Sequence, residues 1–227
     1  MGLRSSQREF HRVVAIDGPA ASGKSSVARE LAGRLGFIYV NSGAIYRAIT
    51  WYLLEKDINA EDTDRIAQAL ESAAITCCIQ ASESRILVDN VDPAAHLRDD
   101  RVNESVSRIS RLPLVRQIVG QKLHERARSD DLVVEGRDIG SVVFPQTPYK
   151  FYVDASPEVR LRRRAAQGER DEIVLRDHAD FSRSVSPLVI AEDAYVIDTS
   201  HLAIEAVVNK IMARLKQMGL QIYRCRD

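Results

Sequence analysis

The chain has 227 residues, a length that suits one domain with a substantial core. Lys and Arg together number 32, as do Asp and Glu, so the formal net charge is +0 and composition alone gives no argument for nucleic-acid binding. Arginine supplies 26 of the 32 basic residues, and its planar guanidinium binds phosphate and carboxylate at two points. A general preference for arginine over lysine would explain the same count.

Several protein classes are excluded early. No apolar run approaches the roughly 18 residues of a membrane span, and the first twelve residues lack the apolar stretch of a signal peptide. The three cysteines form no CxxC pair, so neither a zinc site nor a disulfide framework is indicated. We therefore expect a cytoplasmic protein with neither a membrane nor a nucleic acid as its partner.

The first sixty residues alternate between strand and helix signals. The apolar run 13–16 predicts a buried strand, and the apolar spacing from Gly23 to a stop at Gly36 predicts a helix. A second strand is expected at 37–40, and Ser42 is a suitable cap for a helix over about 43–54.

The rest of the chain continues this rhythm after one interruption. The interruption, at about 59–100, combines a predicted helix at 62–73 with β-like runs at 75–79 and 85–88, which indicates an insertion with its own small antiparallel sheet. Further strands are predicted at 132–135, 150–154 and 194–198, and further helices at 104–111, 114–128, 157–167 and 202–217. The five short apolar strands, separated by helices, predict an α/β fold: a five-stranded parallel sheet with helices on both faces.

The segment from Gly18 to Ser25 matches the phosphate-loop pattern G-x-x-x-x-G-K-[ST] between a predicted strand and a predicted helix. Glycines let the backbone wrap a phosphate, amide N–H groups point inward, Lys24 reaches the outer phosphates and the Ser25 hydroxyl suits Mg²⁺. Asp17 precedes the loop, where either an orienting carboxylate or a simple turn former fits. We expect ATP with Mg²⁺, Ser25 being the metal ligand. The predicted ATP-binding residues here are Gly18, Pro19, Ala20, Ala21, Ser22, Gly23, Lys24, Ser25 and Ser26.

A kinase fits the sequence better than a GTPase switch. The N-K-x-D guanine motif is absent, because the sole Asn-Lys pair, at 209–210, continues with Ile-Met. A kinase needs arginines to hold an anionic acceptor, and Arg47 and Arg137 follow strands whose carboxyl ends bind ligands in open α/β sheets, with Arg116 in a middle helix. It also needs a segment that closes and excludes water. The arginines suited to such a lid are Arg160, Arg162, Arg163, Arg164, Arg170, Arg176 and Arg183.

Four motifs resemble those of bacterial cytidylate kinases. The segment 41–47, NSGAIYR, is similar to D-S-G-A-I-Y-R, and 136–145, GRDIGSVVFP, is similar to G-R-D-[IM]-G-T-V-V-F-P. The D-A-S at 154–156 and the V-S-P-L at 185–188 also match family segments. Two features depart from the family pattern: Asn occupies position 41 where Asp is usual, and the stretch between Arg164 and Arg176 is short.

The resemblance implies transfer of the ATP γ-phosphate to CMP or dCMP by a monomeric enzyme with the nucleoside-monophosphate kinase fold. It implies one kinase domain, with a core of about 13–58, 101–159 and 185–227, a monophosphate-binding insertion at about 59–100 and a lid at about 160–184. Lid arginines Arg163 and Arg164 would contact ATP. The acceptor-binding residues would be Ser42, Arg47, Arg116, Arg137, Asp138, Arg176, Asp180 and Arg183. The residues acting on the transferring phosphate would be Lys24, Arg137, Arg176 and Arg183.

The acceptor base is the most specific part of this hypothesis. Cytosine presents an amino donor at N4 beside acceptors at N3 and O2, whereas uracil presents the reverse at O4 and N3. Asp138 could accept from N4 while neighbouring Arg137 donates to N3 and O2, and such a site rejects the wrong base strongly. Two alternatives stay open: a kinase for another acceptor such as UMP or AMP, and a regulatory module that binds ATP without transferring phosphate.

Overall fold

The computed structural model describes residues 10–166 and 189–221, and its centre is a seven-stranded sheet in the order β3-β4-β2-β5-β1-β6-β7. Five of its strands run parallel to one another: β1 (Val13–Asp17), β2 (Ile38–Asn41), β5 (Leu132–Gly136), β6 (Tyr149–Asp154) and β7 (Tyr195–Asp198). The prediction of an α/β fold with these five parallel strands is confirmed, and their observed bounds lie within one residue of the predicted ones.

The prediction of a five-stranded sheet is nevertheless wrong, because two more strands extend it. Strands β3 (Ile75–Gln80) and β4 (Glu83–Val88) pair with each other in antiparallel fashion, as expected of the insertion. However, β4 also joins β2 in parallel at Tyr39 and Glu83, and the Tyr39 amide donates to the Ser82 carbonyl at 3.0 Å. The hairpin thus occupies the edge of β2, where backbone groups would otherwise lack partners, and does not form a separate sheet.

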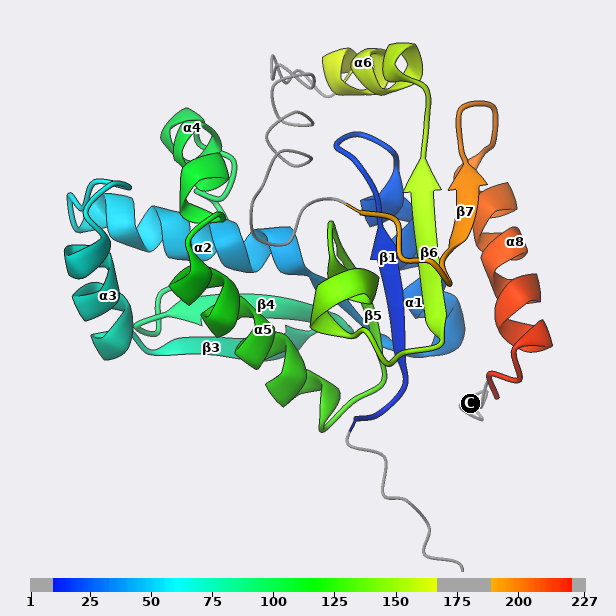
Figure 1. Cartoon of the computed structure of the whole chain (residues 1–227), viewed down its shortest axis with the longest axis horizontal. Helices are drawn as coiled ribbons and strands as arrows, with labels where there is room; N and C mark the ends of the chain where they lie inside the picture. The colour runs from blue at the N-terminus through cyan, green and yellow to red at the C-terminus, as the bar shows by residue number, and fades with distance from the viewer. Residues whose placement is uncertain (1–9, 167–188, 222–227) are drawn as a thin grey trace, which may run out of the picture.

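Helices cover both faces of the sheet (Figure 1). The helices are α1 (Lys24–Leu35), α2 (Ser42–Glu55), α3 (Thr63–Ser72), α4 (Asp100–Ile109), α5 (Pro113–Ala127), α6 (Pro157–Ala166) and α8 (Ile204–Gln217). Alternate residues of β1 face opposite sides: Val14 and Ile16 pack with α1 and α8, whereas Val13 and Ala15 pack with α2 and α5. The central strands are therefore buried on both faces, and their functional residues lie at the strand ends. In the described part of the chain, no helix is both long and apolar enough to span a membrane.

The helix predicted at 104–111 is observed as α4 at Asp100–Ile109, and two details nearer the site also differ from the predictions. Asn41 is the N-cap of α2, since its Oδ1 accepts from the Ala44 amide at 3.1 Å, and Ser42 is the first helical residue. A short π-helical turn, η1 (Ile139–Val143), follows β5 and has no counterpart among the predicted elements. This turn directly follows Asp138, so it positions part of the site described next.

Candidate active site

The phosphate loop connects β1 to α1 and its backbone conformation requires small residues. A Cβ at Gly18 would lie 2.1 Å from the Val153 carbonyl oxygen, so the loop approaches β6 as closely as a glycine allows. Gly23 has φ 93° and Ala21 has φ 57°, both in the left-handed region. The Lys24 ammonium group is buried and donates to the Pro19 carbonyl at 3.0 Å. The loop thus curls around its own lysine.

Side chains from α6 and from the residue after β7 form hydrogen bonds with this loop. Arg163, from α6, donates to the Ser22 carbonyl at 3.0 Å and to the Thr199 carbonyl at 2.8 Å. The Thr199 hydroxyl is buried and lies 2.9 Å from both the Ser22 and the Asp154 carbonyl oxygens. Arg163, for which the sequence predicts a contact with ATP, reaches the phosphate loop and contacts carbonyls of the protein there. Sequence reasoning missed Thr199, whose only signal was its position just after a strand.

A buried carboxylate lies beside the first turn of α1. The Ser25 hydroxyl donates to Glu135 Oε2 at 2.7 Å, and the Tyr39 hydroxyl donates to Glu135 Oε1 at 2.5 Å. Burial and the Glu135 carboxylate raise the Tyr39 pKa well above its usual range, so this hydroxyl stays a donor. Glu135 was not among the predicted site residues, although it stands at the carboxyl end of a central strand.

The donor set at this corner suits magnesium. Mg²⁺ prefers oxygen ligands and is usually held by one or two carboxylates together with substrate phosphates and water. Ser25 and Glu135 offer a hydroxyl and a carboxylate next to the phosphate loop. Within residues 10–166 and 189–221 there is no group of three or more His, Cys, Asp and Glu that would form a protein-only metal centre. The phosphates of a bound nucleotide would add oxygen ligands to those of Ser25 and Glu135.

Asp138, the residue after Arg137, forms a buried ion pair with Arg116, and both residues line the same cavity as the phosphate loop. Their side chains are 6% and 8% exposed, and Arg116 Nη2 contacts Asp138 Oδ2. Arg116 comes from α5, also donates to the Ser110 carbonyl at 3.1 Å, and its guanidinium carbon lies 5.7 Å from the centre of the Tyr46 ring. The sequence analysis considered only neighbouring Arg137 as the partner of Asp138. The structure adds Arg116, which is distant in sequence and holds the carboxylate in one orientation.

Two predicted acceptor residues also tie structural segments together. The Ser42 hydroxyl is buried and donates to the Glu135 carbonyl at 2.7 Å, which joins the start of α2 to the end of β5. Arg47 Nη1 donates to the Leu97 carbonyl and to Asn103 Oδ1, both at 2.7 Å. Arg47 thus holds the end of the 59–100 segment against α2.

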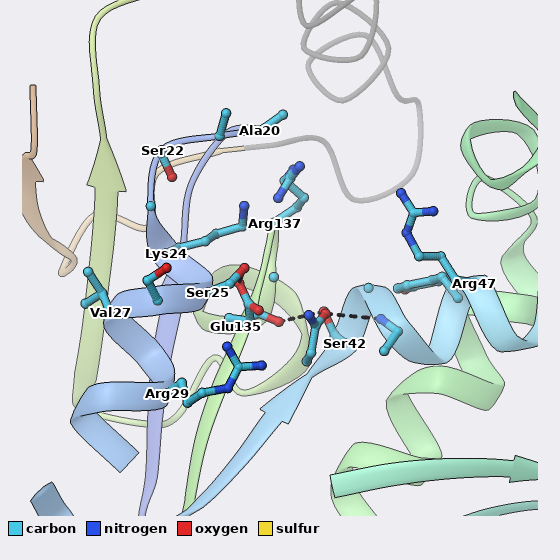
Figure 2. Close-up of a pocket in the computed structure, with 18 of the residues that line it drawn as sticks. Ala20, Ser22, Lys24, Ser25, Val27, Arg29, Ser42, Arg47, Glu135 and Arg137 are labelled. Atoms are coloured by element: carbon cyan, nitrogen blue, oxygen red, sulfur yellow. Dashed lines mark hydrogen bonds between the residues drawn. The ribbon is translucent and has the colours of Figure 1, made fainter. Parts of the chain in front are cut away.

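One cavity of about 890 Å³ collects most of these residues, a volume within the range of small-molecule sites. Figure 2 shows Lys24, Ser25, Glu135 and Arg137 gathered at one side and Arg47 across from them. The predicted residues that line it are Ala20, Ala21, Ser22, Gly23, Lys24, Ser25, Ser26, Ser42, Arg47, Arg116, Arg137, Asp138, Arg163 and Arg164. Gly18 and Pro19 belong to the loop but do not line the cavity. Arg176, Asp180 and Arg183 lie outside the described residues, as does Arg170.

The sequence of the chain is similar to those of one protein family. The profile of the family described as cytidylate kinase matches residues 14–217. The cytidylate kinase of Caldanaerobacter subterraneus subsp. tengcongensis is 38% identical over 215 residues, covering 90% of this chain and 94% of that protein. Those of Desulforamulus reducens and Rhodococcus opacus are 38% and 39% identical, covering 89% and 88% of this chain and 96% and 93% of theirs. The resemblance noted in the sequence is confirmed, and the chain belongs to the cytidylate kinase family.

Proposed function

We propose that this chain transfers the γ-phosphoryl group of ATP to CMP or dCMP, giving CDP or dCDP. The observation that carries the proposal is that the phosphate loop and the buried Arg116–Asp138 pair open onto the same cavity. The phosphate loop suits a triphosphate, and the Asp138 carboxylate that lines the same cavity can identify a base. Membership of the cytidylate kinase family supports the same assignment.

The donor nucleotide occupies the loop end of the cavity. Backbone amides at the N-terminus of α1 and the Lys24 ammonium group face the phosphates, and Arg163 and Arg164 add positive charge from α6. Ser25 and Glu135 are the residues that would hold Mg²⁺ beside them. When bound, Mg²⁺ neutralises phosphate charge and so lowers the electrostatic barrier to attack by another phosphate.

The acceptor base lies against Asp138. Its carboxylate accepts a hydrogen bond from the cytosine N4 amino group, while Arg116 keeps the carboxylate in place. Uracil would bring its O4 acceptor toward the same carboxylate, leaving two acceptors facing each other in a buried site. Arg137 donates to the acceptor from the adjacent position, and Ser42 and Arg47 line the path toward the phosphates.

The transfer step needs no general base. The monophosphate of the acceptor has a second pKa near 6, so one of its oxygens is already anionic at neutral pH. That oxygen forms a bond to the γ-phosphorus, the bond from the γ-phosphorus to the β–γ bridging oxygen breaks, and ADP leaves with the electron pair. Catalysis then consists of alignment and charge neutralisation by Lys24 and Arg137, joined by Arg176 and Arg183.

This proposal includes the finer architecture that the sequence predicted. The chain is one kinase domain of the nucleoside-monophosphate kinase type, in which 59–100 forms the monophosphate-binding insertion and 160–184 forms the lid. The Arg47 contacts to Leu97 and Asn103 support this role for the insertion, because they couple its end to a cavity-lining helix.

The test is ADP formation from Mg-ATP with CMP, dCMP, UMP, AMP or no acceptor. We expect turnover with CMP and dCMP that is lost in Lys24→Ala, because this substitution removes the cation that faces the transferring phosphate. Preference for UMP or AMP would overturn the assignment of the base but leave the kinase chemistry intact. If ADP formed at the same rate without an acceptor, the assignment would be reduced to ATP binding. The same would follow if no ADP formed with any of the acceptors.

A further inference from the structure

Asp17 is the last residue of β1 and directly precedes Gly18 of the phosphate loop. Its side chain is buried and contacts the turn that follows β5. The carboxylate accepts a hydrogen bond from the Ile139 amide at 2.8 Å and another from the Gly140 amide at 2.7 Å. One side chain therefore joins the start of the donor loop to the backbone immediately after Asp138.

The turn that receives Asp17 depends on such an external acceptor. Helical turns leave their first amide groups without partners inside the helix, and η1 has only five residues. Its N-cap residue, Asp138, makes no side-chain hydrogen bond to the turn, because the Asp138 carboxylate instead contacts Arg116. Asp17 thus supplies acceptors where the usual capping residue supplies none.

The fit around Gly140 shows how closely the turn is held. A Cβ at Gly140 would lie 3.1 Å from Lys150 Cγ and 3.3 Å from Asp17 Oδ2, which leaves no room for a side chain without a shift. Lys150 lies on β6, is buried, and its ammonium group donates to the Pro145 carbonyl at 2.8 Å and to Asp193 at 2.9 Å. The turn is therefore confined between two strands, and a change at Asp17 is transmitted to it.

We propose that Asp17 is a positioning residue that aligns the acceptor-reading turn, with Arg137 and Asp138, against the phosphate loop. The assignment rests on the proposed function, since it concerns the alignment of the two substrates of that reaction. Asp17 contacts the backbone amides of the turn, and the turn positions Arg137 and Asp138. Asp17 therefore acts on the acceptor indirectly.

The electrostatic environment of Asp17 agrees with a role in function more than in stability. Burial raises the pKa of the Asp17 carboxyl to about 6, even though the hydrogen bonds from Gly140 and Ile139 act in the opposite direction. The protein thus holds the Asp17 carboxylate in a buried position that disfavours its negative charge. Such arrangements are common where catalysis requires a defined geometry.

The test compares wild type with Asp17→Asn, which keeps the size of the side chain but replaces one acceptor oxygen with an NH₂ donor facing a backbone N–H. We expect kcat/KM for CMP to fall by about 10- to 100-fold, since small misplacements of reacting groups have effects of this size. The preference for CMP over UMP should narrow and KM for ATP should change little. Exchange of the Ile139 and Gly140 amide hydrogens should accelerate, and the melting temperature should fall by a few degrees because one buried N–H loses its acceptor.

Asp131→Asn is the matched control. The Asp131 carboxylate accepts from the Arg12 amide at 2.8 Å, at the opposite end of the same pair of strands and away from the cavity. This control should lower thermal stability without altering the CMP-to-UMP preference. Gly140→Ala is a second variant that disturbs the turn directly, and it should reproduce the kinetic signature of Asp17→Asn.

The two proposals fail in different ways. Wild type that forms no CDP from CMP would overturn the proposed function, and amide exchange at Ile139 and Gly140 would then still decide whether Asp17 holds the turn. Active wild type with an Asp17→Asn variant of unchanged kcat/KM and base preference would overturn the positioning role. Unchanged exchange at both amides in this variant would overturn it as well.

Discussion

Asp138→Asn probes the base-reading arrangement most sharply, because it exchanges one acceptor oxygen for a donor and preserves shape. A hydrogen bond between a charged carboxylate and the cytosine amino group contributes about 1.5–3 kcal/mol. Its loss corresponds to roughly a 10- to 150-fold decrease in kcat/KM for CMP. The new NH₂ group can donate to uracil O4, so activity with UMP should rise relative to CMP. The ratio of kcat/KM for CMP and UMP, measured as ADP formation, gives the result.

Stability separates this effect from general damage to the site. In Asp138→Asn, the amide oxygen can still accept from Arg116, which also keeps its hydrogen bond to the Ser110 carbonyl, although the buried guanidinium loses its compensating charge. In Arg116→Met, by contrast, the buried Asp138 carboxylate loses this partner, which destabilises proteins by about 3–5 kcal/mol. For a chain of this length, that corresponds to a decrease in melting temperature of roughly 6–20 °C. Asp138→Asn keeps the hydrogen bonds of the pair and loses only its charge compensation, so it should be destabilised less than Arg116→Met.

The reasoning would be refuted if Asp138→Asn kept the wild-type ratio of CMP to UMP activity while folding normally. It would also be refuted if Arg116→Met melted within a degree or two of wild type, since the pair could then not be the buried, mutually dependent unit that the structure describes.

Three further predictions concern the phosphate loop, the proposed magnesium ligand Glu135 and the dependence of stability on pH. Gly18→Ala should abolish ATP binding measured by calorimetry, because its Cβ would lie 2.1 Å from the Val153 carbonyl oxygen. The control variant Gly33→Ala should bind ATP normally, because no atom lies within 4 Å of a Cβ at that position. ATP binding by both variants would contradict the loop geometry. Glu135→Gln should raise the Mg²⁺ concentration needed for half-maximal activity by about 10- to 100-fold. An unchanged Mg²⁺ concentration would show that Glu135 does not help to hold the metal. The raised pKa of Asp17 favours folding of the protonated form, a contribution complete below about pH 4 and lost as pH rises through about 6. The unfolding free energy of wild type relative to Asp17→Asn should therefore increase by about 2 kcal/mol between pH 7 and pH 4 in denaturant titrations, and a flat difference would contradict the shift.

Local patterns were sufficient to predict much of the fold. The apolar runs and their helical neighbours predict the parallel strands β1, β2, β5 and β6 because a strand covered on both faces must be largely apolar. Strand β7 is predicted by its apolar run as well, although it lies at the edge of the sheet and three of its four residues are exposed. The phosphate loop is equally local, since the loop, its lysine and its serine occupy eight consecutive residues. The attachment of β4 to β2 could not be predicted in the same way. It depends on a single pairing, between Tyr39 and Glu83, that no periodicity in either strand encodes.

Long-range contacts explain what sequence reasoning missed in the site. Arg116 and Asp138 were each predicted to bind the acceptor, but their pairing depends on how α5 packs beside β5. Glu135 and Thr199 carry no motif signal of their own, and they enter the site because parallel strands end at the same edge of the sheet. For Asp17, the sequence left two roles open, an orienting carboxylate and a simple turn former. Its contact with Gly140 spans 123 residues and becomes visible only in three dimensions.

The central claim is that one cavity brings ATP and a cytidine monophosphate together for direct phosphoryl transfer. Its most direct test follows γ-³²P-labelled ATP in the presence of Mg²⁺, with and without CMP, in wild type and in Lys24→Ala. The proposed function predicts that the label appears in CDP in wild type only, with little inorganic phosphate released. Label recovered as inorganic phosphate at the same rate with and without CMP would contradict it.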